Sequence, residues 1–445
     1  MIAELKIEKQ MARVRFLEII LAVVLAALRA HAGLFDKAWL KGSTDGNPLS
    51  YRPGETIPFT VTPMALDGAV PEGAYELRWK RSDDFGAIEE GVEPFAGEPF
   101  VFETSLDRPG FVRLEVGVHD AASGERLLLF DGGAGISPEA LEPPAEPDDF
   151  DEFWLRQFAR LDLVPVKADL AETDCPNSDC RRWAVRVDCA GLRPVTGYLS
   201  IPKAAGEGAK FPCRLATQGY NGDQFLPNKP GDARPDEIVF DINAHGLKLP
   251  EFGASEADRK ALRWEVRSHD EKYAYDPAQN ADPETAYFNG MVLRVKRALQ
   301  FLKTIEGWNG RDLYAEGGSQ GGLQTIWAAG CGEGVTKAFP YVTWCCDMPT
   351  NEARLARKDA ADGGCIPWVP ALGYYDAVTW AKRIPEECRV EITRAGLGDY
   401  VSPPSGLAKL WNAIHCGNKK IVWVQGSRHK EIPPPYEGRD TAISQ

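Results

Sequence analysis

The sequence lacks several features that would place it in a familiar class of protein. It has no excess of basic residues: the formal net charge of its 445 residues is −14 at pH 7, which argues against a nucleic-acid partner. It has no paired C-x-x-C spacing of the kind that binds zinc, and no internal repeat. Its 44% hydrophobic and 26% charged residues are ordinary for a globular protein. An acidic surface is compatible with a neutral small molecule or a polysaccharide as substrate.

The sequence also lacks an apolar run long enough to cross a bilayer as a helix. Its apolar run near the N-terminus extends only from Ile19 to Leu28. Arg13 and Arg15 precede this run, and the small-x-small sequence Ala30-His31-Ala32 follows it, which is the layout of a secretory signal peptide. We therefore interpret residues 1–32 as a signal peptide, with an uncleaved anchor or a frayed N-terminal helix as the alternatives. After cleavage we expect a secreted or periplasmic protein with no stable membrane span.

Ten cysteines are many for a cytosolic enzyme, and export would permit disulfides. Cys175 and Cys180, in "CPNSDC", are close enough in sequence to close a small loop. Cys345 and Cys346 are adjacent and cannot easily bridge each other, so we expect each to pair elsewhere or to stay buried.

Residues 33–140 are predicted to be all-β. The segments "ETIPFTVTP", "AYELRWKRS" and "FVRLEVGVHD" alternate apolar and polar residues and are rich in β-branched and aromatic types. Pro-Gly and Asp-Gly turns separate such segments. A small immunoglobulin-like β-sandwich is the expected architecture. A linker rich in proline and acidic residues follows at 137–149.

Residues 141–445 are predicted to form an α/β domain. The segment "DDFDEFWLRQFARLDL" has the apolar spacing of an amphipathic helix. After it, predicted strands such as "FPCRLATQGY", "EIVFDINAHG" and "AFPYVTWCCD" alternate with predicted helices such as "YFNGMVLRVKRALQFLKTIEGW". This alternation predicts a mostly parallel sheet.

One serine lies among four glycines in "EGGSQGGLQTIWAAG". Ser319 occupies the centre of a G-x-S-x-G match that runs from Gly317 to Gly321. The match is weak alone, but here a predicted strand precedes it and a predicted helix follows it, as the strained turn of a nucleophilic serine requires. A flexible loop that happens to fit the pattern is the alternative.

A serine hydroxyl needs a base, and in this arrangement the partners follow in the order serine, acid, histidine. Of the two histidines after Ser319, His429 follows the last predicted strand, whereas His415 ends a predicted helix, where histidine more often caps the dipole. Asp399 follows the preceding strand in "AGLGDYVSPPS" and is the expected acid, with Asp347 as the alternative.

Acyl transfer also needs two donors for the oxyanion. Gln320, the residue after the serine, is expected to supply one backbone N–H. The loop "ATQGYNGDQ" follows an early strand, and Tyr220 in it is expected to supply the second. The alternative for Tyr220-Asn221-Gly222 is an ordinary β-turn.

Taken together, these residues and motifs resemble those of a known enzyme family. The motifs "GGSQGG", "GYNG", "PP" shortly after the acid, "HKE" and the "DDFDEFW" helix resemble those of the acetyl xylan esterase and cephalosporin C deacetylase family, carbohydrate esterase family 7. The resemblance covers about residues 147–435. It implies an α/β-hydrolase fold and removal of acetyl groups from short xylo-oligosaccharides and related small esters. The family commonly forms closed oligomers, an assembly that the extra N-terminal domain and an altered second motif put in doubt here. We expect no cofactor and no metal. The resemblance assigns Ser319, Asp399 and His429 to the triad and the backbone N–H groups of Tyr220 and Gln320 to the oxyanion hole.

The sequence departs from this family at two places. The family's Arg-Gly-Gln motif is replaced by Asn243-Ala244-His245-Gly246, and Lys430 interrupts the His-Glu pair near the end. His245 could contact substrate at the carboxyl end of a strand or could be a structural replacement, which we place slightly ahead. With Asp241 it gives only two ligands, too few for a metal site.

Three points stay open in the sequence. A peptidase or a broad-specificity esterase of the same fold, or a non-catalytic carbohydrate-binding protein, remain alternatives to the deacetylase. The aromatic residues of 351–388 either cap the site and stack on sugars or pack as an ordinary helical insert. Because every candidate site residue follows residue 147, we expect the N-terminal domain to be dispensable for the chemistry if its interface is modest.

Overall fold

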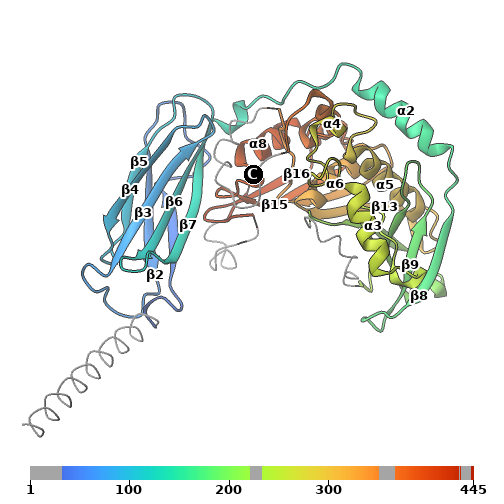
Figure 1. Cartoon of the computed structure of the whole chain (residues 1–445), viewed down its shortest axis with the longest axis horizontal. Coiled ribbons are helices and arrows are strands. Elements are labelled where there is room, and N and C mark those ends of the chain that lie inside the picture. Colours follow the sequence, from blue (N-terminus) through green and yellow to red (C-terminus); the bar gives the residue numbers. More distant parts are fainter. Residues whose placement is uncertain (1–32, 221–232, 350–365, 430, 432–441, 445) are drawn as a thin grey trace, which may run out of the picture.

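The computed structural model describes residues 33–220, 233–349, 366–429, 431 and 442–444. The predicted signal peptide, residues 1–32, and Lys430 lie outside these ranges. Figure 1 shows a β-strand part, in blue, beside a larger part in which helices pack on a central sheet. None of the helices within the described ranges is long and apolar enough to cross a membrane.

The N-terminal part consists of two antiparallel sheets. One has the strand order β1-β2-β5 and the other β4-β3-β6-β7. Alternating residues of β2 and β6, among them Phe59, Val61, Leu114 and Val116, are buried between the sheets and form one apolar core. The strands are β1 (Trp39–Thr44), β2 (Ile57–Met64), β3 (Tyr75–Asp83), β4 (Ile88–Pro94), β5 (Phe100–Thr104), β6 (Gly110–Asp120) and β7 (Arg126–Ile136).

The second part contains one large mixed sheet, with the order β17-β16-β15-β14-β13-β11-β12-β10-β9-β8. Its centre, from β12 to β16, is parallel, and the strands at both ends pair antiparallel. This confirms the predicted mostly parallel sheet. The strands are β8 (Ala168–Thr173), β9 (Cys180–Val187), β10 (Val195–Pro202), β11 (Phe211–Thr217), β12 (Ile238–Ile242), β13 (Trp308–Gly318), β14 (Lys337–Tyr341), β15 (Arg389–Gly396), β16 (Lys419–Val424) and β17 (Ala442–Ser444).

Helices pack on this sheet through apolar faces. α2 contacts α5, α5 contacts α6, α6 contacts α7, and α7 contacts α8. Because α6 lies in the middle of this series, all of its residues up to Ala329 are buried. The helices are α2 (Phe150–Asp162), α3 (Glu256–Val266), α4 (Pro277–Asn280), α5 (Tyr287–Leu302), α6 (Gln320–Gly330), α7 (Ala377–Ala381) and α8 (Pro404–Ala413).

The two parts share a close interface rather than only a linker. The side chain of Gln425, just after β16, accepts from the Gly133 N–H at 2.9 Å and donates to the Gly133 carbonyl at 2.8 Å. The ring of Phe111 on β6 stacks on Trp423 on β16, with ring centroids 5.8 Å apart. Figure 1 shows β7 of the N-terminal part facing α8 and the β15–β16 end of the large sheet.

No disulfide forms among the cysteines in the described ranges. Cys175 and Cys180 are free thiols, as are Cys345 and Cys346, and the other cysteines in the described ranges are unbridged too. Cys180 begins β9 with its side chain buried, and its thiol contacts the carbonyl of Arg234 at 3.4 Å. The loop suggested by "CPNSDC" is therefore held by strand pairing and not by a covalent bond.

Candidate active site

Ser319 lies on a strained turn between β13 and α6. Its backbone has φ 58° and ψ −118°, a conformation that L-residues rarely adopt and that costs about 1–3 kcal/mol. Glycine is required on both sides of the serine. A Cβ on Gly317 would lie 2.3 Å from the Thr217 hydroxyl, and one on Gly321 would lie 2.5 Å from the Thr217 carbonyl oxygen. The glycine cluster thus lets strand β11 approach the turn that presents the serine.

The predicted strand "AFPYVTWCCD" ends early because its chain folds around this turn. β14 stops at Tyr341, and Val342 has φ 42°. The Ser319 N–H donates to the Tyr341 carbonyl at 3.0 Å, and the Trp344 N–H donates to the Ser319 carbonyl at 3.1 Å. The backbone of the serine is therefore fixed from both sides.

Three side chains from separate loops meet at this turn. His429 Nε2 lies 2.9 Å from Ser319 Oγ, and His429 Nδ1 lies 2.8 Å from Asp399 Oδ2. Asp399 is fully buried, and its other oxygen accepts the N–H groups of Val401 and Ser402, both at 2.9 Å. These contacts orient the carboxylate toward the imidazole, so the arrangement can remove a proton from the serine hydroxyl.

The alternatives weighed from the sequence lie elsewhere. The carboxylate of Asp347 is 2.5 Å from Lys409 Nζ, where it forms a nearly buried ion pair. His415 is exposed just after α8 and lines neither cavity beside the triad. The structure thus groups Ser319, His429 and Asp399, and it leaves Asp347 and His415 out.

The two expected oxyanion donors flank the serine. Gln320 is the first residue of α6, where a backbone N–H has no partner within the helix. Its buried side-chain oxygen accepts the Tyr273 hydroxyl at 3.1 Å. The loop that carries Tyr220 also approaches: a Cβ on Gly219 would lie 3.8 Å from Ser319 Cβ. The ring of Tyr220 packs against Tyr273, with centroids 4.4 Å apart, which holds Tyr220 against the core.

His245 is placed as a structural residue. It is 1% exposed, its Nδ1 contacts the Tyr287 hydroxyl, and burial lowers its pKa well below the ordinary value. The segment that replaces the Arg-Gly-Gln motif is braced by Arg294 on α5, which donates to the Ala244 carbonyl at 2.7 and 3.1 Å. This placement favours the structural role over a substrate contact. In the described ranges no group of three or more His, Cys, Asp or Glu residues could hold a metal ion.

Two aromatic residues of the insert before β15, Tyr375 and Trp380, are core residues. Tyr375 is 0% and Trp380 1% exposed, and both pack on Trp154 of α2, with centroids 5.6 and 4.9 Å away. Stacking on sugars is therefore wrong for these two, and ordinary packing is right. Residues 350–365 of this insert lie outside the described ranges.

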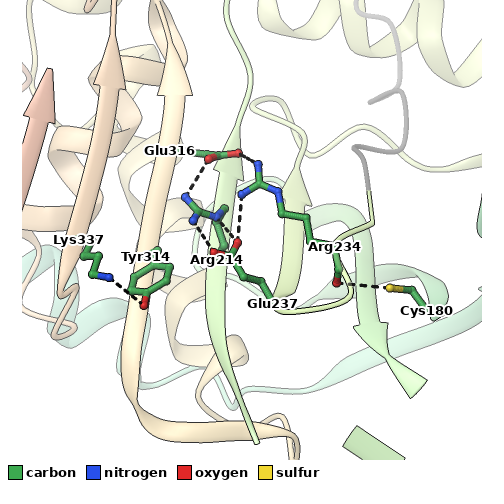
Figure 2. A network of polar contacts seen from close by, with 7 residues as sticks. All are labelled: Cys180, Arg214, Arg234, Glu237, Tyr314, Glu316 and Lys337. Atoms are coloured by element: carbon green, nitrogen blue, oxygen red, sulfur yellow. Dashed lines mark hydrogen bonds and ion pairs between the residues drawn. The ribbon is translucent and has the colours of Figure 1, made fainter. Parts of the chain in front are cut away.

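A network of charged residues fastens β11 to β13 just before the serine (Figure 2). Arg214 donates to Glu237 at 2.5 and 2.6 Å and to Glu316 at 2.8 Å. Arg234 donates to the same two carboxylates, at 3.0 and 2.8 Å. Burial alone would raise the pKa of Glu237, but Arg214 and Arg234 bring it below the ordinary value. Nothing in the sequence pattern indicated this network, because its members come from distant segments.

A cavity of about 270 Å³ opens beside the serine. It is bounded by Gly219 and Ser319 on one side and by Tyr341, Arg394 and His429 on the other. A substrate carbonyl in this cavity would lie next to the serine hydroxyl.

A mostly parallel sheet, a serine on a strained strand–helix turn and a histidine that bridges it to a buried aspartate define the α/β-hydrolase class. Comparison with known proteins gives the family within that class. The sequence profile described as "Acetyl xylan esterase (AXE1)" matches residues 142–441. The chain therefore belongs to the acetyl xylan esterase family and is a carboxylic ester hydrolase, which confirms the resemblance seen in its motifs.

Individual relatives agree with this assignment. The chain is 27% identical to acetyl esterase Axe7A of Xylanibacter ruminicola over 338 residues, which cover 72% of this chain and 70% of that protein. The structure of an acetyl xylan esterase from Paenibacillus sp. R4 matches with a TM-score of 0.52 and 22% identity, over 68% of this chain and 96% of the other. Acetyl xylan esterase 1 from Thermoanaerobacterium sp. matches with a TM-score of 0.50 and 18% identity, over 68% and 95%. The structural matches show the shared fold.

Proposed function

We propose that this protein is an exported serine esterase that removes acetyl groups from carbohydrates through an acyl-enzyme intermediate. The observation that carries the proposal is the pair of contacts made by His429, 2.9 Å to Ser319 Oγ and 2.8 Å to Asp399 Oδ2. A histidine held in this way can act as base toward the serine and as acid toward the leaving group.

In the first half of the reaction, Ser319 Oγ attacks the ester carbonyl as His429 Nε2 takes its proton. Asp399 accepts the Nδ1–H of His429, which fixes the reactive tautomer and stabilises the imidazolium that forms. The negative oxygen of the tetrahedral intermediate is bound by the backbone N–H groups of Tyr220 and Gln320. The intermediate collapses when His429 gives its proton to the leaving alcohol, and acetyl stays on the serine.

In the second half, water replaces the alcohol. His429 takes a proton from the water as its oxygen attacks the acetyl-serine carbonyl, and the same two N–H groups bind the second oxyanion. Collapse releases acetate and returns the proton to Ser319 Oγ. No cofactor is needed, because the imidazole returns every proton that it takes.

The substrate class rests on the family and on the site. The relatives named above are acetyl or acetyl xylan esterases, and the cavity of about 270 Å³ beside Ser319 is small. Export rests on the layout of residues 1–32. Mass spectrometry of the protein recovered outside the producing cells tests it, with a mature chain that begins at Gly33 as the expected result and an uncut chain as the contrary one.

A comparison of ester and amide substrates tests the reaction. The protein should hydrolyse p-nitrophenyl acetate and leave peptide p-nitroanilides intact, and Ser319→Ala should abolish the activity. Faster cleavage of the anilide would indicate a peptidase, and a folded protein inactive on both would indicate a binding protein. A panel of acetylated xylan, pectin and mannan oligomers then identifies the carbohydrate.

A further inference from the structure

A second, larger cavity reaches the triad from the N-terminal part. It measures about 820 Å³, within the range of roughly 300–1,000 Å³ typical of ligand sites. One wall is made by the hydrolase loops that carry Asp399 and His429, together with Tyr400 and Arg428. The other wall comes from β3, β4, β6 and β7. Arg428 and His429 line both cavities, so the two cavities adjoin at these residues.

The N-terminal wall is the outer face of the sheet β4-β3-β6-β7. Lys80 on β3 lies directly opposite Glu90 on β4 and Glu115 on β6. Beside them, Arg113 donates to Asp131 at 2.8 and 2.6 Å. Cationic donors and carboxylate acceptors thus alternate across this face.

A face of this kind suits one chemical class of ligand. Each hydroxyl of a sugar offers one donor and two acceptor positions, so a polyhydroxylated chain can bond to both kinds of side chain. An anionic polymer would meet the carboxylates. Apolar side chains such as Val92 and Leu129 also line the cavity, but an acyl chain could not bond to the charged groups beside them.

The position of the cavity decides which half of the ester it receives. The leaving alcohol must lie at His429 Nε2, because that nitrogen returns the proton to it. The large cavity is lined by His429 and Asp399 but not by Ser319, whereas the small one is lined by Ser319. Both Ser319 and His429 line the small cavity, so the ester group reacts there, and a long alcohol half extends past His429 and Arg428 toward the large cavity.

We propose that the outer face of the sheet β4-β3-β6-β7 binds the carbohydrate chain that carries the ester, so that the N-terminal domain is part of the substrate site. This inference rests on the proposed function and adds the domain that selects the alcohol half of the substrate. A small ester such as p-nitrophenyl acetate has no sugar to place on this face, whereas an acetylated oligosaccharide does.

The test compares the two substrates in the full-length protein. Lys80→Ala, Glu90→Ala and Arg126→Ala each remove one polar side chain that lines the cavity. The ratio of kcat/KM for acetylated xylo-oligosaccharides to kcat/KM for p-nitrophenyl acetate should fall by about ten-fold in each, the usual effect of losing a hydrogen bond to a charged group. In a Ser319→Ala background, calorimetry should show a matching rise in the Kd for the oligosaccharide.

Matched controls lie on the opposite side of the same domain. Lys41→Ala and Glu103→Ala remove charges from β1 and β5 of the other sheet and should leave the ratio unchanged. An unchanged ratio in the cavity variants, with the wild type active on the oligosaccharide, would overturn this inference and leave the proposed function standing. A wild type that hydrolyses only the small ester would overturn the carbohydrate substrate itself. An equal fall in the kcat/KM ratio in the cavity variants and the controls would show that the substitutions act through stability. That result would also overturn this inference.

Discussion

Gly398 packs against the main chain of Asp131 so closely that a Cβ on residue 398 would lie 2.0 Å from the Asp131 carbonyl oxygen. Gly398 adjoins the triad acid Asp399, and Asp131 belongs to β7 of the N-terminal part. A Cβ on Gly133, two residues further along β7, would likewise lie 3.0 Å from the Leu397 carbonyl oxygen. The N-terminal domain therefore supports the loop that holds the acid.

Adding a methyl group at this contact should damage both stability and catalysis. Gly398→Ala forces two backbones apart, which costs about 1–3 kcal/mol of stability, and a shift of about 1 Å in the acid loop can lower kcat by about 100-fold. The thermal midpoint and kcat on p-nitrophenyl acetate measure the two effects. Gly417→Ala is the control, because nothing lies within 4 Å of its added Cβ. Wild-type behaviour of Gly398→Ala would contradict the close packing.

Removal of residues 33–140 should lower activity even on a small ester. The sequence suggested the opposite, on the condition of a modest interface, but Gln425 bonds to both polar groups of Gly133 and Trp423 stacks on Phe111. Without the domain, a buried amide and an indole lose their partners beside the triad loops. The measurement is kcat/KM on p-nitrophenyl acetate for a truncated chain shown to be folded by circular dichroism. Full activity in that chain would refute the supporting role.

Stability should fall as the pH rises through neutrality because of Asp84. This carboxyl is buried at the interface, and burial, the largest cause, raises its pKa from 3.8 to about 7, although Ser405 and the Phe111 N–H oppose the rise. The folded pKa exceeds the unfolded one, so the native state binds the extra proton between the two values. The stabilisation is complete below the unfolded pKa and is lost as the pH approaches 7.

The variant Asp84→Asn isolates this effect, because its side chain carries no titrating proton. The thermal midpoint of the wild type should fall more than that of Asp84→Asn between about pH 5 and about pH 8. Asp376, whose pKa burial also raises to about 7, contributes equally to both proteins and cancels in the comparison. Parallel curves for the two proteins would show that Asp84 does not titrate in this range.

The small cavity should restrict the acyl group. Each added methylene must find space or cause strain at a cost of roughly 1–3 kcal/mol, so p-nitrophenyl acetate should be preferred over the butyrate by about ten-fold or more in kcat/KM. The octanoate should be nearly inert. A series of p-nitrophenyl esters checks this, and a rise in kcat/KM from acetate to octanoate would indicate a lipase-like esterase instead.

The sequence predicted that Ser319, Asp399 and His429 would lie together, because their grouping follows local rules. A serine between Gly317 and Gly321, after a strand and before a helix, has a recognisable pattern, and chain order then selects Asp399 over Asp347 and His429 over His415. The parallel sheet followed from alternating strands and helices. These features depend on short segments in which the residue types and their spacing indicate the local structure.

Features that depend on long-range contacts could not be predicted in this way. β7 packs on the loop of Asp399 because Gly398 and Gly133 allow two distant backbones to approach closely. The sequence does not show which distant segment a given glycine will contact. The helix Glu256–Val266 was missed, and its Trp264 is 69% exposed, which weakens the apolar pattern. The spacing of Cys175 and Cys180 permits a disulfide, but the structure leaves both thiols free.

The most direct test of the account is a double-mutant comparison of Ser319 and His429. We expect Ser319→Ala to lower kcat on p-nitrophenyl acetate by about 10⁴-fold or more, and His429→Ala added to it to cost little further, because triad members act as one unit. Ser319→Ala, His429→Ala and the double variant should all keep the wild-type circular dichroism spectrum. Losses that multiply in the double variant would show that the two residues act independently and would contradict the proposed mechanism.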